Sequence, residues 1–234
     1  MSIVRATDAR GITTLTVDDG KVNAYDAAFF AELDAALDDC AGDAAVVIAG
    51  RPGMFSAGLD RRVLDAGDDA AIGDLLVALG RTTLRVWTEP RPLVAAVTGH
   101  AVAAGTILAM ACDHVVAAAG DFKWGLLETT IGFPMPRFVL DIAERTVRAD
   151  RLDDLVLSGT LLTPEEAVEA GFADVVVPAE ETVAAAQERA AELAALPRHA
   201  YAATKRRLRG AAAERATRGL VEDVAALLSE RAGG

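Results

Sequence analysis

Short apolar runs alternate with longer stretches of helical periodicity along most of the chain. Runs bounded by glycine, proline or aspartate predict strands at residues 2–5, 12–17, 45–49, 93–97, 115–119 and 173–177. Helical spacing predicts helices at 26–40, 72–88, 101–112, 136–145, 149–157, 180–196 and 198–231, the last broken near Gly210. This alternation predicts a parallel, helix-covered sheet over residues 1–178, followed by a helical tail.

Two helix starts carry specific capping signals. Asp26 can cap a helix whose apolar face holds Phe29, Phe30, Leu33 and Leu37. Residues 163–166, Thr-Pro-Glu-Glu, form a capping box with proline at the first helical position. Residues 50–60 are rich in turn formers and directly follow a predicted strand, so a loop is expected there.

Residues 93–134 hold the most informative pattern. The apolar run 93–97 is followed by a turn of small residues, 101–105, and then by a predicted buried helix. The first N–H groups of a helix lack intrahelical acceptors and lie at the positive end of its dipole, so they can hold a phosphate, a carboxylate or a developing oxyanion. Close packing of helix against sheet explains the same small residues, and the stretch taken alone favours packing.

Two loops at predicted strand ends can share one site. Open α/β folds bind ligands outside the carboxyl ends of their strands, and residues 55–60 and 100–105 both lie there. Each loop can contribute a backbone N–H. The hypothesis that follows is an oxyanion hole made by two main-chain donors.

Composition narrows the classes of function. The 234 residues are 52% apolar, which suits one large α/β domain with an appendage, and the net charge of −12 argues against nucleic acid and anionic membranes as partners. The most apolar window, 93–112, is too rich in alanine for a transmembrane helix. The first ten residues lack the apolar centre of a signal peptide. Cys40 and Cys112 show no metal or redox spacing, so a reducing cytoplasm is expected.

Three ordered stretches carry a family resemblance. They are Phe55-Ser56-Ala57-Gly58-Leu59-Asp60, residues 95–113 and residues 161–171. Over about residues 3–209 the sequence resembles the crotonase, or enoyl-CoA hydratase/isomerase, superfamily. The resemblance implies a superhelix of repeated β-β-α units with a C-terminal helical region, acyl-CoA substrates, and trimers or dimers of trimers. Residues 1–196 would form the acyl-CoA-binding and catalytic core, and 197–234 would serve oligomerisation and CoA contact.

The resemblance also assigns the two main-chain donors. By position they are the N–H groups of Leu59 and Ala104, which would bind the thioester oxygen and stabilise an enolate, each by roughly 3 kcal/mol. Family members usually have glycine around the second donor, whereas this chain has Ala103-Ala104-Gly105, which reduces backbone freedom. Such chemistry requires no metal and no cofactor apart from the CoA of the substrate.

The acidic residues favour one reaction among several. Hydratases of the family use two glutamates; the position of the first is Ile107 here, and that of the second matches Glu128. One carboxylate can move a proton from the α to the γ carbon, so a Δ3,Δ2-enoyl-CoA isomerase with Glu128 as acid and base is favoured. The further acid of dienoyl-CoA isomerases is replaced by Pro136. A one-glutamate hydratase, helped by Asp141 or Glu144, and a non-catalytic acyl-CoA-binding protein are the alternatives.

The remaining assignments concern substrate binding. The resemblance places Ala24, Ala57 and Asp60 beside the CoA moiety. Gly105 is a further candidate substrate-binding residue. Candidate acyl-pocket residues, each also explicable as ordinary core, are Leu64, Trp87, Phe133, Met135 and Phe138. Lys205, in a basic island on the last helix, either binds CoA phosphates or belongs to the solvated face of an amphipathic helix.

Overall fold

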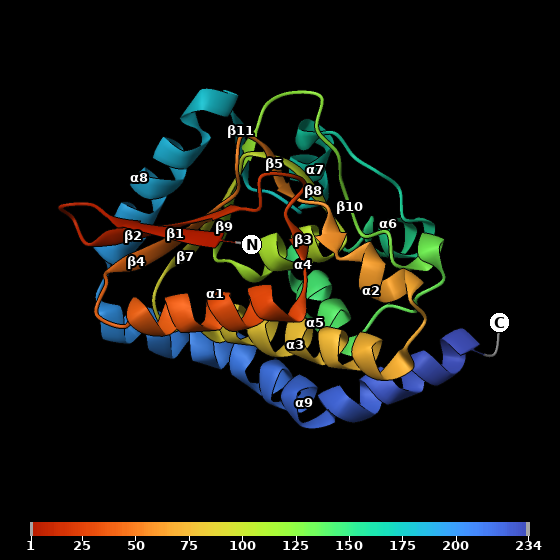
Figure 1. Cartoon of the computed structure of the whole chain (residues 1–234). Coiled ribbons are helices and arrows are strands. Elements are labelled where there is room, and N and C mark those ends of the chain that lie inside the picture. The colour runs from red at the N-terminus through yellow and green to blue at the C-terminus, as the bar shows by residue number, and fades with distance from the viewer. Residues whose placement is uncertain (1, 233–234) are drawn as a thin grey trace.

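The computed structural model describes residues 2–232 and is organised around a six-stranded sheet (Figure 1). The strands are β1 (Ser2–Thr7), β2 (Ile12–Asp18), β3 (Ala24–Tyr25), β4 (Ala45–Ala49), β5 (Gly53–Ser56), β6 (Gly58–Leu59), β7 (Leu93–Val97), β8 (Gly99–Val102), β9 (His114–Ala118), β10 (Trp124–Gly125) and β11 (Val175–Val177). The main sheet has the order β1-β2-β4-β7-β9-β11. Only the β1–β2 pair within it is antiparallel among the described strands.

Helices follow the strands in a repeating pattern. The α-helices are α1 (Ala27–Asp39), α2 (Arg61–Asp65), α3 (Asp69–Thr88), α4 (Ala104–Ala111), α5 (Arg137–Thr146), α6 (Leu152–Ser158), α7 (Pro164–Ala170), α8 (Thr182–Ala194) and α9 (Arg198–Ala232), and the 3-10 helices are η1 (Thr129–Ile131) and η2 (Ala179–Glu181). A strand of the main sheet, a short strand of the sheet β10-β8-β5 and a helix succeed one another, as in β7-β8-α4 and β9-β10-α5. The predicted β-β-α architecture with a C-terminal helical region is confirmed.

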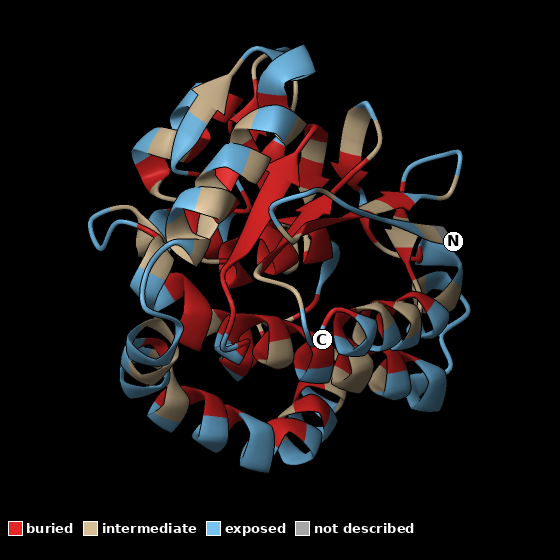
Figure 2. Cartoon of the chain, turned by 90° about the vertical axis from the view of Figure 1, so that its left-hand side faces the viewer, coloured by how far each residue is buried: buried red, intermediate tan, exposed pale blue. Residues whose placement is uncertain are grey.

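The main sheet is covered on both faces (Figure 2). On one face, Ala186 and Ala190 of α8 pack against Val47 and Val94 of the central strands. On the other, a larger cluster joins the sheet to α1, α3, α4 and α9. Every residue of β4 and β7 is buried, which explains why these strands are continuous apolar runs in the sequence.

Both capping predictions are confirmed. The Asp26 carboxylate accepts a hydrogen bond of 2.8 Å from the Phe29 N–H, and the four predicted apolar positions of α1 are buried. At α7, Thr163 and Glu166 form the reciprocal bonds of the capping box.

The predicted helix at 101–112 is wrong at its beginning. Residues 99–102 form strand β8, which pairs in parallel with β5 and β10, and α4 starts only at Ala104. The pairing depends on Gly99, because a Cβ there would lie 1.9 Å from the Gly53 carbonyl carbon. The expected loop at 50–60 likewise contains two short strands, β5 and β6. Pairing between residues distant in sequence overrides the local pattern in both places, small residues at 101–105 and turn formers at 50–60.

The predicted break near Gly210 does not occur. Helix α9 runs without interruption from Arg198 to Ala232 and packs along α3 and α5. A glycine in a helix costs about 1 kcal/mol, and burial of Ala213, Ala216 and Leu220 against α3 and α5 offsets this cost. Over the described residues, none of the helices combines the length and apolar character needed to cross a membrane.

Candidate active site

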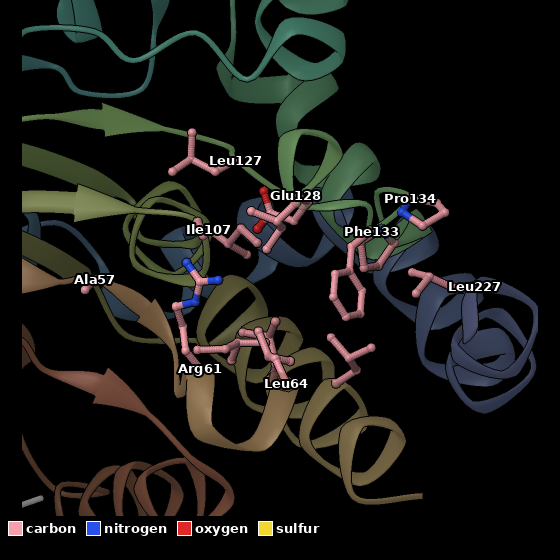
Figure 3. Close-up of a pocket in the computed structure, with 15 residues that line it drawn as sticks. Ala57, Arg61, Leu64, Ile107, Leu127, Glu128, Phe133, Pro134 and Leu227 are labelled. Carbon is pink, nitrogen blue, oxygen red and sulfur yellow. The ribbon is translucent and has the colours of Figure 1, made fainter. Parts of the chain in front are cut away.

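One pocket lies where α2, α3, α4, the η1 segment and the end of α9 converge (Figure 3). Fifteen residues line it, and most of them are apolar. They are Ala57, Leu59, Arg61, Leu64, Leu76, Leu79, Ala103, Ile107, Leu127, Glu128, Ile131, Phe133, Pro134, Pro136 and Leu227. An apolar cleft with two charged side chains has the usual character of a site for a largely apolar ligand.

The two predicted donor loops pack directly against each other. A Cβ at Gly58, whose φ is +94°, would lie 3.0 Å from the Ala103 Cβ and 3.5 Å from the Ala104 nitrogen. The Asp60 N–H donates to the Tyr25 carbonyl at 2.8 Å, so the preceding N–H, that of Leu59, points away from β3. Leu59 and Ala103 both line the pocket.

Ala104 is the first residue of α4. Its N–H belongs to the first helical turn and therefore has no intrahelical acceptor. The preceding residue, Ala103, has φ 49° and ψ −121°, a conformation that non-glycine residues rarely adopt. Its N–H donates to the Gly125 carbonyl at 2.8 Å, which fixes the turn against β10. The structure thus brings the two predicted donors to neighbouring positions at one end of the pocket.

Glu128 lines the pocket from the turn that precedes η1. Its Oε2 atom is buried and has no hydrogen-bond partner within the described residues. Burial raises the pKa of its carboxyl group to about 7, against the smaller opposing effect of nearby backbone N–H groups. The Phe133 N–H donates to the Glu128 carbonyl at 2.9 Å and closes the turn. A carboxyl group with this pKa can both accept and donate a proton near neutral pH.

No second carboxyl group lines this pocket in the described part of the chain. Ile107 is 1% exposed and occupies the wall near Glu128 (Figure 3). Asp141 and Glu144, the predicted alternative acids, are instead held by Arg137 at 2.9 Å and 3.1 Å. Pro136 lines the pocket and cannot transfer a proton.

The structure separates the predicted binding residues into two groups. Ala57, Leu64 and Phe133 line the pocket, together with the residues named above. The others lie outside it and support it. Ala24 pairs with Gly58 across β3 and β6, and Asp60 caps α2 and binds Arg62. Gly105 packs on Ser56, and the core contains Met135, Trp87 and Phe138.

Lys205 occupies a position at odds with phosphate binding. Its ammonium group is buried and donates to the Glu89 and Arg91 carbonyls, at 2.6 Å and 2.8 Å, and to the Asp113 carboxylate. All three of its N–H donors are therefore used within the protein. It also lies 22 positions before Leu227 on α9, roughly 33 Å along the helix. The solvated-face alternative does not hold for Lys205, because only 6% of its side chain is exposed, but it holds for the neighbouring Arg206 and Arg207 of the same basic island, which are exposed.

Sequence reasoning missed several pocket residues. Leu76 and Leu79 were recognisable only as part of a helix face, and Leu227, on α9, lies 99 positions further along the chain than Glu128. Arg61 adjoins the Phe55–Asp60 motif, but no periodicity indicates that its side chain faces a ligand pocket.

Known proteins similar to this chain include both isomerases and a hydratase. The human mitochondrial delta3-delta2-enoyl-CoA isomerase superposes with a TM-score of 0.91 at 30% identity, covering 98% of this chain and 91% of that one. An enoyl-CoA isomerase of Mycobacterium tuberculosis superposes with a TM-score of 0.88 at 34% identity, covering 96% and 97%. The 2,3-dehydroadipyl-CoA hydratase of Escherichia coli is 32% identical over 194 residues, 80% of this chain and 73% of that protein.

The family profile gives the same result over nearly the whole chain. The profile described as enoyl-CoA hydratase/isomerase matches residues 7–230, which include both donor loops, Glu128 and the apolar end of the pocket. The protein is therefore an enzyme of the enoyl-CoA hydratase/isomerase family, within the crotonase superfamily.

Proposed function

We propose that the protein is a Δ3,Δ2-enoyl-CoA isomerase, which moves the double bond of an acyl-CoA thioester into conjugation with the carbonyl. The observation that carries the proposal is that Glu128 is the sole carboxyl group lining the pocket within the described residues, with Ile107 beside it (Figure 3). A single carboxyl group suffices for a proton shuttle, whereas addition of water benefits from a second group that orients the water.

The proposed reaction divides the work between backbone and side chain. The N–H groups of Leu59 and Ala104 form an oxyanion hole for the thioester oxygen. Ionised Glu128 takes a proton from C2 of the 3-enoyl chain, and the electrons delocalise onto that oxygen. The protonated carboxyl group then returns the proton to C4, which leaves the double bond between C2 and C3. Atoms and charge balance, and the enzyme is regenerated.

The similarity to both isomerases and a hydratase makes water addition the competing reaction. Wild-type enzyme is incubated with 3-hexenoyl-CoA and, separately, with 2-hexenoyl-CoA, and the products are separated by chromatography. We expect isomerisation of the 3-enoyl form and little hydration of the 2-enoyl form. Faster hydration would assign the protein to the hydratases, and tight binding with no turnover would make it a binding protein.

Glu128→Gln removes the proton shuttle but keeps the size of the side chain. We expect the isomerisation rate to fall by at least about 100-fold, because general acid–base catalysis contributes factors of this size. The matched control is Glu144→Gln, a carboxylate of α5 outside the pocket, which should retain activity. Equal activity of both variants would remove Glu128 from the mechanism.

A further inference from the structure

Arg61 is the second charged residue of the pocket. It is the first residue of α2, two positions after Leu59, and it lines the pocket together with Leu64 one helical turn later. Figure 3 shows its guanidinium group directed from α2 toward the side on which Ile107 and Glu128 lie. The cation therefore faces the half of the pocket in which the thioester and its neighbouring carbons would react.

The adjacent arginine serves as an internal comparison. The Arg62 guanidinium turns back to the Asp60 carboxylate at 2.6 Å, outside the pocket, and that carboxylate also caps α2. Arg61 has only a loose ion pair, 3.7 Å from Asp65, with 77% of the Arg61 and 66% of the Asp65 side chain exposed. Such exposed ion pairs contribute little to the free energy of folding, so the Arg61 guanidinium is available to a stronger acceptor.

Arg61 and Glu128 face one pocket without pairing. Among the ion pairs of the described residues, none joins these two side chains. A direct ion pair would favour the ionised carboxyl group and bring the pKa of Glu128 down from about 7. An anion carried by the ligand would satisfy the guanidinium and leave Glu128 able to hold a proton.

We propose that Arg61 binds a carboxylate on the acyl chain of the acyl-CoA ligand. This inference rests on the proposed function and adds a substrate class to it. The position of Arg61, opposite Glu128 and beside Leu59, favours a carboxylate a few carbons from the thioester. The guanidinium group is suited to this role because its planar fork binds a carboxylate with two parallel hydrogen bonds.

Equilibrium binding separates the possible sources of the anion. Wild-type protein, Arg61→Met and Arg61→Lys are titrated calorimetrically with butyryl-CoA, glutaryl-CoA and free CoA, none of which has a double bond to shift. We expect Arg61→Met to weaken glutaryl-CoA binding about tenfold and butyryl-CoA binding less than twofold. Arg61→Lys should give an intermediate loss. Arg218→Met, an exposed arginine of α9 outside the pocket, is the control for net charge.

Each other outcome has a definite meaning. An equal loss for all three ligands shows that Arg61 binds a phosphate of the CoA moiety that they share, and it overturns the inference. Unchanged affinity for all three ligands overturns the inference and leaves the proposed function intact. If the wild-type protein binds neither butyryl-CoA nor CoA, the proposed function fails and the inference fails with it. The melting temperature of each variant verifies that the fold is retained.

Discussion

At the residue scale, the chemistry depends on how a few groups are surrounded. Glu128 could be singled out from the sequence because it matches the position of the second glutamate of the family's hydratases. The pKa of its carboxyl group is raised by burial among apolar side chains such as Ile107, which folding brings next to it. Lys205 was a candidate for binding CoA phosphates, whereas in the folded protein its ammonium group donates to two backbone carbonyls and to the Asp113 carboxylate.

The raised pKa of Glu128 predicts that the stability difference between the wild type and Glu128→Gln depends on pH. Between about pH 4.5 and 7 the folded state keeps this proton and the unfolded state loses it, so the free energy of unfolding falls as pH rises. The effect is at most on the order of 3 kcal/mol. Glu128→Gln lacks this titration. Its free energy of unfolding relative to that of the wild type, measured by urea denaturation, should therefore be higher at pH 8 than at pH 4.5.

Glu144→Gln again provides the control, because that carboxylate is exposed and lies outside the pocket. Its stability difference from wild type should change much less across the same pH range. If the Glu128→Gln difference is the same at both pH values, the carboxyl group titrates alike in the folded and unfolded states and is not suited to shuttle a proton near neutrality.

At the element scale, long continuous patterns were predicted well and short paired segments were not. The strands β4 and β7 and the helices α1 and α3 are set by apolar spacing within a single segment. The strands β5 and β8 form by pairing with each other, and β8 also pairs with β10 on its other edge. Neither Gly53–Ser56 nor Gly99–Val102 shows a strand-specific apolar pattern, so a reading of local sequence extends the helix α4 backward over β8.

The turn between β8 and α4 stores strain that a substitution can release. Ala103 has φ 49°, and a non-glycine residue in such a region costs about 1–3 kcal/mol. Ala103→Gly should raise the free energy of unfolding by about 1 kcal/mol, because part of the gain is lost to the greater freedom of glycine in the unfolded chain. Ala101→Gly, in β8 and without positive φ, should instead lower it. Denaturant titration measures both, and destabilisation by Ala103→Gly would contradict the strain.

At the scale of the whole molecule, α9 links two regions that are far apart along its axis. Near its start, Lys205 and Arg209 bind the buried Asp113 carboxylate, which also accepts the Leu93 N–H at 2.8 Å. Near its end, Leu227 lines the pocket and Arg231 lies 4.5 Å from the Phe133 ring centroid. The helix was predicted from the sequence, whereas this docking was not, because it joins residues about 90 positions apart.

Lys205→Met tests the structural role of the buried ion cluster. The substitution leaves the Asp113 carboxylate buried with only part of its positive charge neutralised, so the free energy of unfolding should fall by about 3–5 kcal/mol. Arg206→Met changes an exposed neighbour and should have an effect within about 0.5 kcal/mol. Urea denaturation supplies the values. Wild-type stability combined with weakened binding of free CoA would instead restore the phosphate-binding assignment of Lys205.

The end of α9 also predicts which acyl chains the pocket accepts. Leu227 closes the apolar end, so Leu227→Ala should extend the pocket and raise kcat/KM for long 3-enoyl chains relative to short ones by about tenfold. Leu228→Ala removes the same volume from a neighbouring side chain that packs near Gly73 of α3 and does not line the pocket. Both variants lose stability because each substitution leaves a cavity. A shift in chain-length preference that both variants share would therefore reflect loosening of α9. A shift confined to Leu227→Ala places the end of the acyl chain against this helix.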